Sequence, residues 1–349
     1  MTSPATARRL WALGEPYHAL TYFADECRTA AEATGLRGFW RTYFALRAAP
    51  LGPVGAEVVT ATFYNFAPDF VARRVPEVWE VADPASVLDA RLAGVDAAVR
   101  RAVGEEWLRS AEAAETTELL GVAAAAVDAP GRPLAAANAG LPVPAEPHLA
   151  VWQSLTTLRE HRGDGHNAAL LQRGISGVGA HVLAAAAGRT AREWLMRARG
   201  WDDAAWDVAA EGLTARGWLA AGELTAEGAA IVAAVEADTD RLALGPWQAL
   251  GDARCDRLAE LLGPVRRAVV AAGSGRRATR SAFRTPAELW PAGDTCRRLL
   301  DDPSTSDSHG ALRRAASRQE LLSTPVSQVT LSSRRVPHVP RRVSCTQVN

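Results

Sequence analysis

The densest group of polar side chains in the sequence lies within six residues, at positions 161–166. Two histidines, an aspartate and an arginine occur there with two glycines, whereas most of the sequence is rich in alanine, leucine and valine. These side chains can exchange protons near neutral pH, bind anions or hold a metal ion. The segment consists of His161, Arg162, Gly163, Asp164, Gly165 and His166.

One hypothesis is a ligand-binding or catalytic site. If a helix begins at Gly165, its first backbone amides lie beside Arg162, and that combination suits a carboxylate or phosphate group. His161 or His166 could then act as a general acid or base, with Asp164 fixing the imidazole tautomer. The segment is therefore the candidate centre of a small-molecule site, although its residues name no ligand and no reaction.

Two other interpretations stay open. As ordinary turn chemistry, His161 ends one helix, Gly163 takes a positive φ, and Asp164 caps the next helix. As a metal site, His161 and His166 need Asp164 as a third ligand, and no obvious fourth ligand lies nearby. Two histidines five residues apart are a weaker metal signal than HExxH. We therefore expect no metal and no cofactor.

Helices must position this segment, because alanine and leucine dominate the sequence and clusters of β-branched residues are few. Five prolines at 128–147 predict a connection between an N-terminal helical domain, 1–127, and a C-terminal one, 148–265. The predicted fold class is mainly α: two related helical, winged-helix-like domains, a small β-wing and a disordered C-terminal tail. The expected helices are 16–34, 39–48, 55–66, 69–79, 85–103, 105–127, 148–160, 165–173, 176–187, 190–199, 203–216, 225–243 and 246–262.

An internal repeat relates the two halves at an offset of 139 residues. It aligns Tyr22 and Asp25 with His161 and Asp164, so that each half contains an equivalent turn. If the halves pack as a pseudo-dimer, the two turns face a shared cavity with an aromatic lining. Polar tips on a tyrosine and an asparagine set this cluster apart from ordinary core aromatics. The expected lining is Tyr17, His18, Tyr22, Trp40, Tyr43, Phe63, Tyr64 and Asn65.

The second half contains the sequence pattern of a winged helix. A short helix, 190–199, is followed by a helix at 204–216, a hairpin near 221–222 and a long helix from 231. The segments LTARGWL and LTAEGAAIV are its most specific parts. Over residues 190–243 the sequence resembles the MarR-type winged-helix domain, and the resemblance implies a DNA-binding regulator.

Charge argues against DNA as the partner. Contacts to bases and phosphates need arginine, lysine or amide side chains, but residues 201–240 hold nine acidic side chains and a single basic one, Arg216. The nine are Asp202, Asp203, Asp207, Glu211, Glu223, Glu227, Glu236, Asp238 and Asp240. Four arginines just before them keep DNA open as an alternative: Arg189, Arg192, Arg197 and Arg199.

Four longer motifs resemble an actinobacterial family, the SalK-like helix-turn-helix proteins. They are GLRGFWRTYFALRAAPLGPV (35–54), VTATFYNFAP (59–68), LREHRGDGH (158–166) and RGWDDAAW (199–206). The resemblance covers about residues 7–265. It implies a helix-turn-helix fold and frequent proximity to genes of specialised metabolism, and it supplies no catalytic residues.

The expected function is that of an intracellular helix-turn-helix-like protein that binds a small molecule of specialised metabolism. The alternatives are a MarR-like DNA-binding regulator and a metabolic enzyme that uses His161 or His166 as acid or base. Catalytic residues are unknown at this stage. The candidate ligand-binding residues are His161, Arg162, Asp164, His166, Tyr22, Asp25, Tyr64 and Asn65.

The chain of 349 residues has a formal net charge of zero that is unevenly distributed. From Ser274 onward 13 arginines stand against six acidic residues, and the composition predicts a basic, mostly disordered tail within 266–349. The four cysteines are far apart, and neither a signal peptide nor a membrane span is evident. These features predict a cytoplasmic protein without a membrane partner.

Overall fold

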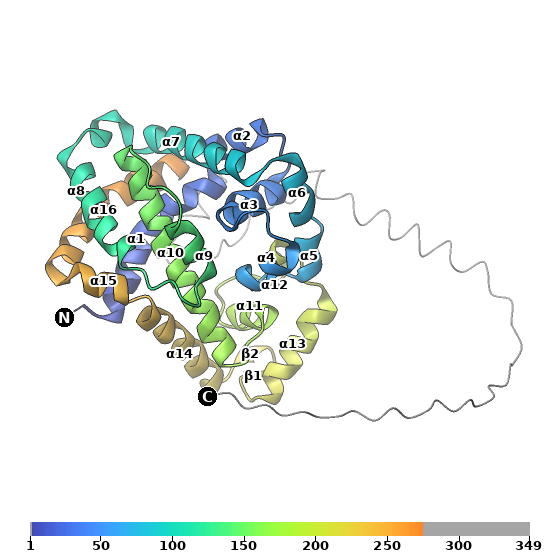
Figure 1. The fold of residues 1–349 in the computed structure, drawn as a ribbon. Coiled ribbons are helices and arrows are strands. Elements are labelled where there is room, and N and C mark those ends of the chain that lie inside the picture. The colour runs from blue at the N-terminus through green and yellow to red at the C-terminus, as the bar shows by residue number, and fades with distance from the viewer. Residues whose placement is uncertain (1, 275–349) are drawn as a thin grey trace, which may run out of the picture. The chain divides into compact units, whose positions relative to one another are not determined.

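Helices form almost all of the regular structure. A computed structural model of the protein describes residues 2–274 (Figure 1). It confirms the mainly α class, with one two-stranded sheet in the described part of the chain. The elements are α1 Pro4–Phe23, α2 Asp25–Ala33, α3 Phe39–Ala48, a 3-10 turn Ala49–Leu51, α4 Ala56–Phe63, α5 Pro68–Ala72, α6 Val75–Val81, α7 Pro84–Leu108, α8 Ala111–Ala125, α9 Pro133–Ala139, α10 Pro147–Gln172, α11 Gly177–Ala186, α12 Arg192–Arg199, α13 Asp203–Ala215, β1 Leu219–Ala220, β2 Glu223–Leu224, α14 Ala226–Leu242, α15 Gly245–Leu250 and α16 Asp252–Ser274.

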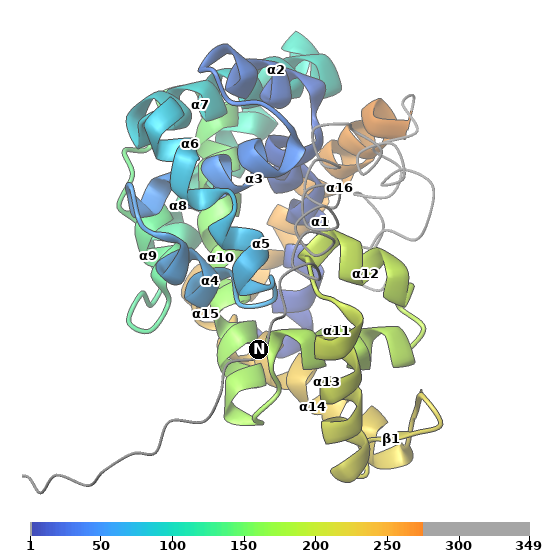
Figure 2. The same ribbon diagram turned by 90° about the vertical axis from the view of Figure 1, so that its right-hand side faces the viewer.

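Helix α10, which is 26 residues long, runs through the middle of the described chain (Figures 1 and 2). Pro147 occupies its first position, where a missing N–H leaves no helical hydrogen bond unmade. Every residue from His148 to Leu158 is buried. A helix that is covered on all sides belongs to the interior of a protein, so α10 is the support against which the other helices pack.

Two hydrophobic cores contact α10 at different positions along its length. The first contains Trp152 and other residues from the N-terminal half of α10, together with α1, α7, α8, α15 and α16. The second contains Leu170 near the end of α10, together with residues of α3–α5 and α11–α14. The polar residues 161–166 therefore lie between the two cores.

The predicted turn at 161–166 is wrong, because α10 continues through it without a break. Neither Gly163 nor Gly165 has a positive φ. A Cβ atom on Gly165 would lie 2.8 Å from Arg132 Nη1 and 3.2 Å from Leu242 Cβ. Glycine is needed there because neighbouring side chains approach the helix closely, and not because the chain turns.

The matching turn predicted at Tyr22–Asp25 has a different geometry from the segment aligned with it. Helix α1 ends at Phe23, Ala24 has an extended backbone with φ −76 and ψ 137, and α2 begins at Asp25. The aligned residues 161–164 are helical. The two segments are therefore not equivalent turns, and the division of the chain into two domains stays a prediction.

Helices α11–α14 follow the order that the sequence predicted. Ser176, Asp202 and Thr225 cap α11, α13 and α14, because each side chain accepts a hydrogen bond from a backbone N–H of the first turn. Strands β1 and β2 pair antiparallel, with Leu219 opposite Leu224. Three short helices, a hairpin and a longer helix thus follow one another along the chain.

Some predicted boundaries differ from the structure. The connection at 128–147 contains the short helix α9. Residues 266–274, which were expected to begin the tail, complete helix α16, because Val265 and Val269 are buried four residues apart on one helical face. The rest of the predicted tail lies outside the described residues. Within residues 2–274 no helix is both long and apolar enough to cross a membrane.

Candidate ligand-binding site

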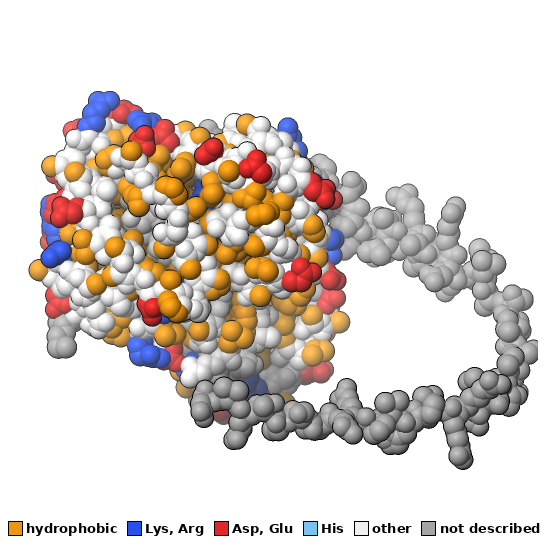
Figure 3. All heavy atoms as spheres, viewed as in Figure 1, with side chains coloured by type: hydrophobic (Ala, Val, Ile, Leu, Met, Phe, Trp, Pro, Cys, Tyr) orange, Lys and Arg blue, Asp and Glu red, His pale blue; other side chains and the backbone are white. Residues whose placement is uncertain are grey.

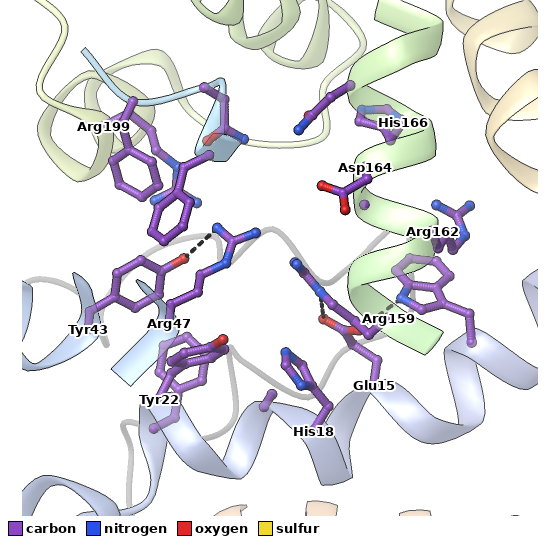
Figure 4. Close-up of a pocket in the computed structure, with 18 of the residues that line it drawn as sticks. Glu15, His18, Tyr22, Tyr43, Arg47, Arg159, Arg162, Asp164, His166 and Arg199 are labelled. Atoms are coloured by element: carbon purple, nitrogen blue, oxygen red, sulfur yellow. Dashed lines mark hydrogen bonds and ion pairs between the residues drawn. The ribbon is translucent and has the colours of Figure 1, made fainter. Parts of the chain in front are cut away.

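A cavity of about 280 Å³ lies beside the polar segment of α10 (Figure 4). Its walls come from α1, α3, α10, α12 and α14 and from the turn after α4, so residues far apart in the sequence meet around one space. The lining consists of Trp11, Glu15, His18, Ala19, Tyr22, Phe23, Phe39, Trp40, Tyr43, Arg47, Phe63, Asn65, Phe66, Arg159, Arg162, Gly163, Asp164, His166, Asn167, Trp194, Arg199 and Glu236.

Aromatic rings supply much of this lining: nine of the lining residues are phenylalanine, tyrosine or tryptophan. The rings contact one another across helices, with the centroids of Tyr22 in α1 and Tyr43 in α3 5.0 Å apart. After α4 the backbone of Tyr64 takes a φ of 63, which is uncommon for a residue other than glycine. This change of direction follows Phe63 and precedes Asn65, and both residues line the cavity. Flat apolar walls of this kind suit a flat apolar ligand.

A buried ion-pair network joins α3 to α10 at the edge of the cavity. The Glu160 carboxylate, which is 1% exposed, accepts hydrogen bonds from Arg47 Nε and Nη2 at 3.2 and 3.1 Å and from Arg159 Nη1 at 2.8 Å. Burial alone would raise the pKa of Glu160, but the two arginines lower it to about 2. Arg47 also donates to the Tyr43 hydroxyl at 3.3 Å. The network fixes one charged wall.

His18 projects from α1 toward the cavity (Figure 4). Its side chain is 1% exposed, and its Nδ1 lies 3.0 Å from the Thr156 hydroxyl of α10. Its Nε2 has no hydrogen-bond partner among residues 2–274. Burial, followed by the nearby arginines, holds the pKa of His18 well below its usual value, so the ring is neutral at pH 7. One buried polar atom therefore remains available to a ligand.

The opposite wall carries His166 and Arg162, both on α10. His166 Nδ1 lies 2.9 Å from the Thr239 hydroxyl of α14, and burial lowers the pKa of His166 to about 4. Arg162 donates to Asp240 Oδ1 at 2.8 Å, and its guanidinium lies 4.1 Å from the centroid of the Trp11 ring. These contacts hold α14 against the cavity wall.

Asp164 lies on α10 between Arg162 and His166; it is buried and lines the cavity. Its Oδ2 accepts a hydrogen bond from the backbone N–H of Ala135 in α9 at 3.0 Å, so the side chain caps α9 and not its own helix. Burial raises the pKa of Asp164 to about 6, and the Ala135 N–H opposes that shift. The carboxyl group can therefore change its charge near physiological pH.

A model of a helix-turn-helix family matches residues 7–276 of the chain, which include almost all of the described residues. The chain belongs to this helix-turn-helix family. Neither a curated protein nor a solved structure matches the chain. The chemistry of the cavity in this family member therefore follows from the geometry of the side chains that line it.

The structure brings together five of the eight predicted site residues of this helix-turn-helix family member. These five line the cavity: Tyr22, Asn65, Arg162, Asp164 and His166. The other three, His161, Tyr64 and Asp25, do not.

Each of the three has a different place in the fold. His161 is buried outside the cavity, and its carbonyl oxygen accepts a hydrogen bond from Arg132 at 2.6 Å. The Tyr64 hydroxyl donates to the Ile175 carbonyl instead. Asp25 borders a separate hollow of about 50 Å³. The sequence predicted that two turns would face a shared cavity. In the structure two helices, α1 and α10, face it instead.

His18 and Tyr22 were predicted to line the cavity, but Trp11 and Glu15 on the same helix were missed, although their spacing carries a signal. Trp11, Glu15, His18 and Tyr22 follow one another at intervals of four, three and four residues. That spacing places them on one face of a helix, and all four line the cavity. A face on which aromatic and ionisable residues alternate differs from an ordinary apolar stripe.

Metal binding was one of the interpretations for the segment 161–166. Within the described residues no group of three or more histidine, cysteine, aspartate or glutamate side chains could hold a metal ion. His161 lies outside the cavity that His166 lines. The side chains that line the cavity of this helix-turn-helix family member can form hydrogen bonds, ion pairs and aromatic contacts.

Proposed function

We propose that this protein binds a small aromatic molecule in the cavity between α1, α3 and α10. The observation that carries the proposal is the combination of nine aromatic lining residues with the buried His18, whose Nε2 has no hydrogen-bond partner within residues 2–274. A volume of about 280 Å³ is close to the lower end of small-molecule sites, which span roughly 300–1,000 Å³. The resemblance to SalK-like proteins supports a ligand from specialised metabolism.

We further infer that α11–α14 and the hairpin form a winged helix of the MarR type, with α13 in the position of the recognition helix. The exposed acids Asp203, Asp207 and Glu211 follow one another at intervals of four along α13 and so share one face. Arg192 Nη2 pairs with two of them, at 2.9 and 3.1 Å. A face with this charge repels phosphate, which supports a ligand-binding role without tight DNA binding.

A DNA-binding regulator with the same ligand cavity is the second candidate. Helix-turn-helix family membership favours it, as do Arg189, Arg192 and Arg197 beside or on α12. On the face shown in Figure 3, arginine side chains are scattered near the edges and do not form one basic patch. DNA binding by counterion release needs several such side chains on one surface.

The proposal can be tested with a panel of fused-ring aromatic compounds, using quenching of tryptophan fluorescence, because Trp11, Trp40 and Trp194 line the cavity. A Gly163→Leu variant places a side chain in the cavity, and its Cβ has ordinary contacts at 3.5 Å. Gly121→Leu is the matched control, because Gly121 is an exposed residue of α8 with nothing within 4 Å of its Cβ position.

We expect the native protein and Gly121→Leu to bind the same compounds with equal affinity. Gly163→Leu should bind them roughly tenfold more weakly, or not at all, which corresponds to about 1.4 kcal/mol or more. Circular dichroism shows whether each variant is folded. If the native protein binds no member of the panel, or if Gly163→Leu binds as well as the control, the proposed function is wrong.

A further inference from the structure

Two histidines on facing walls of the cavity present ring nitrogens of opposite polarity. We propose that the ligand is a flat aromatic compound with two polar groups, an acceptor oxygen such as a carbonyl facing His18 and a hydroxyl donor facing His166. The inference rests on the proposed function, because it names the class of ligand for the same cavity.

The hydrogen bonds on the Nδ1 side of His166 make its Nε2 an acceptor. The Thr239 hydroxyl donates its single hydrogen to the Val235 carbonyl at 2.7 Å. While the hydroxyl makes that bond, it can only accept from His166 Nδ1, which lies 2.9 Å away. The proton of the neutral ring sits on Nδ1, and Nε2 is left with a lone pair. This Nε2 makes no hydrogen bond within the described chain and suits a hydroxyl donor.

The hydrogen bond on the Nδ1 side of His18 runs in the opposite direction and makes its Nε2 a donor. The Thr156 hydroxyl, which is buried, has His18 Nδ1 as its only hydrogen-bond partner among the described residues. If the hydroxyl donates to Nδ1, its hydrogen is satisfied; in the other tautomer that buried hydrogen has no acceptor, which is costly. Nε2 then carries the ring proton, and it is the buried atom that lacks a partner. This Nε2 suits an acceptor oxygen.

Charged groups at His18 support the position of the acceptor oxygen. Arg47 and Arg159 are the nearer charges at His18, together with the Glu160 carboxylate that they share. Cations beside a donor strengthen the attraction for an acceptor oxygen. At His166 the strongest charge influence is the Glu236 carboxylate, followed by Arg162, and both side chains also line the cavity. Cations therefore act on both histidines, and the hydrogen bonds made by each Nδ1 set the opposite polarity of the two Nε2 atoms.

Four naphthalene compounds test the inference: an acetylnaphthalene with a hydroxyl group on the distant ring, its methyl ether, the corresponding naphthol without the acetyl group, and naphthalene itself. Affinities are measured by titration calorimetry with the full chain. One hydrogen bond contributes about 1.4 kcal/mol, or about tenfold in affinity. We expect the hydroxyl ketone to bind about tenfold more tightly than either compound that lacks one group, and naphthalene to bind most weakly.

Two isosteric variants test the two proposed hydrogen bonds to the ligand one at a time. Thr239→Val removes the acceptor that fixes the His166 tautomer, so the preference for hydroxyl over methyl ether should fall to about threefold or less. Thr156→Val should reduce only the preference for the acetyl group. Thr239→Ser keeps the hydroxyl and should restore the native preference. His161→Gln is the control, because His161 is buried in the same helix outside the cavity.

The two proposals fail in different ways. If naphthalene and its derivatives all bind with equal affinity and Gly163→Leu abolishes that binding, the cavity is a ligand site but the assigned polarity is wrong. A crossed result, in which Thr239→Val alters the preference for the acetyl group, also overturns the assignment. If no compound binds the native protein, both the ligand class and the proposed function are wrong.

Discussion

Replacing Gly163 with alanine tests the central difference between the sequence-based expectation and the structure. In a turn with positive φ, alanine is strained and destabilises the protein by about 1 kcal/mol. In the interior of a helix, the same change removes the entropic cost of glycine and stabilises the protein by about 0.5–1 kcal/mol. The structure places Gly163 inside α10, without a positive φ.

The space around Gly163 allows the stabilising outcome. The nearest atoms to its Cβ position are Arg159 Nη1 and Glu160 Oε2, both at 3.5 Å, which is an ordinary van der Waals distance. We therefore expect Gly163→Ala to raise the free energy of unfolding by about 0.5–1 kcal/mol, or the melting temperature by about 1–3 °C. Urea unfolding at pH 7, followed by circular dichroism, measures the difference.

Gly165→Ala is the matched comparison two residues away in the same helix. Its Cβ would lie 2.8 Å from Arg132 Nη1. That guanidinium cannot move freely, because it donates to the carbonyls of His161 at 2.6 Å and Leu242 at 2.9 Å. We expect a loss of about 1–3 kcal/mol from overpacking. A destabilised Gly163→Ala together with a neutral Gly165→Ala would refute the continuous helix.

Three further predictions concern charge. Glu160→Gln should lower the free energy of unfolding by about 3 kcal/mol in urea titrations, because Arg47 and Arg159 lose their buried counter-charge; an unchanged midpoint would contradict the network. Burial lowers the pKa of His161 from 6.5 to about 4, so the unfolded chain takes up the proton first and stability falls as the pH falls from 6.5 to 4. In His161→Gln that decline should be shallower, and an identical pH profile would refute the assignment. Fluorescence anisotropy should show no DNA duplex bound more tightly than about 1 μM at physiological salt; a nanomolar, steeply salt-dependent complex would contradict the argument from acidic residues.

The segment 161–166 shows why a local pattern can predict the wrong geometry. Glycine marks turns in most sequences, and each glycine in a helix costs about 1 kcal/mol relative to alanine. In α10 that cost is offset by tertiary packing: the helix is buried on both sides of the segment by two separate cores. Small residues are needed there because Arg132 and Leu242 approach Gly165. Contacts with residues 29 or more positions away cannot be derived from the segment itself.

The helical class and the helices at 39–48, 176–187, 203–216 and 225–243 could be predicted, since periodicity and capping residues act within each helix. Part of the site could be predicted in the same way, because aromatic residues cluster in the sequence around 39–66. The partners of the buried charges could not. Arg47 and Glu160 are 113 residues apart, and their pairing depends on how α3 packs beside α10. Sequence shows that an arginine is present, but not which carboxylate neutralises it.

The proposed recognition helix and the cavity would serve different functions, and the charge of their side chains favours the cavity. A helix-turn-helix fold can serve many functions, so the function must be argued from the side chains that the fold presents. On α13 the exposed residues Asp203, Asp207 and Glu211 repel phosphate. On α12 and α14, Trp194, Arg199 and Glu236 face the cavity. The helices next to α13 in the sequence thus contribute side chains to the cavity, and the exposed acids of α13 point to the same conclusion. Both observations support our proposal that this helix-turn-helix family member binds a ligand.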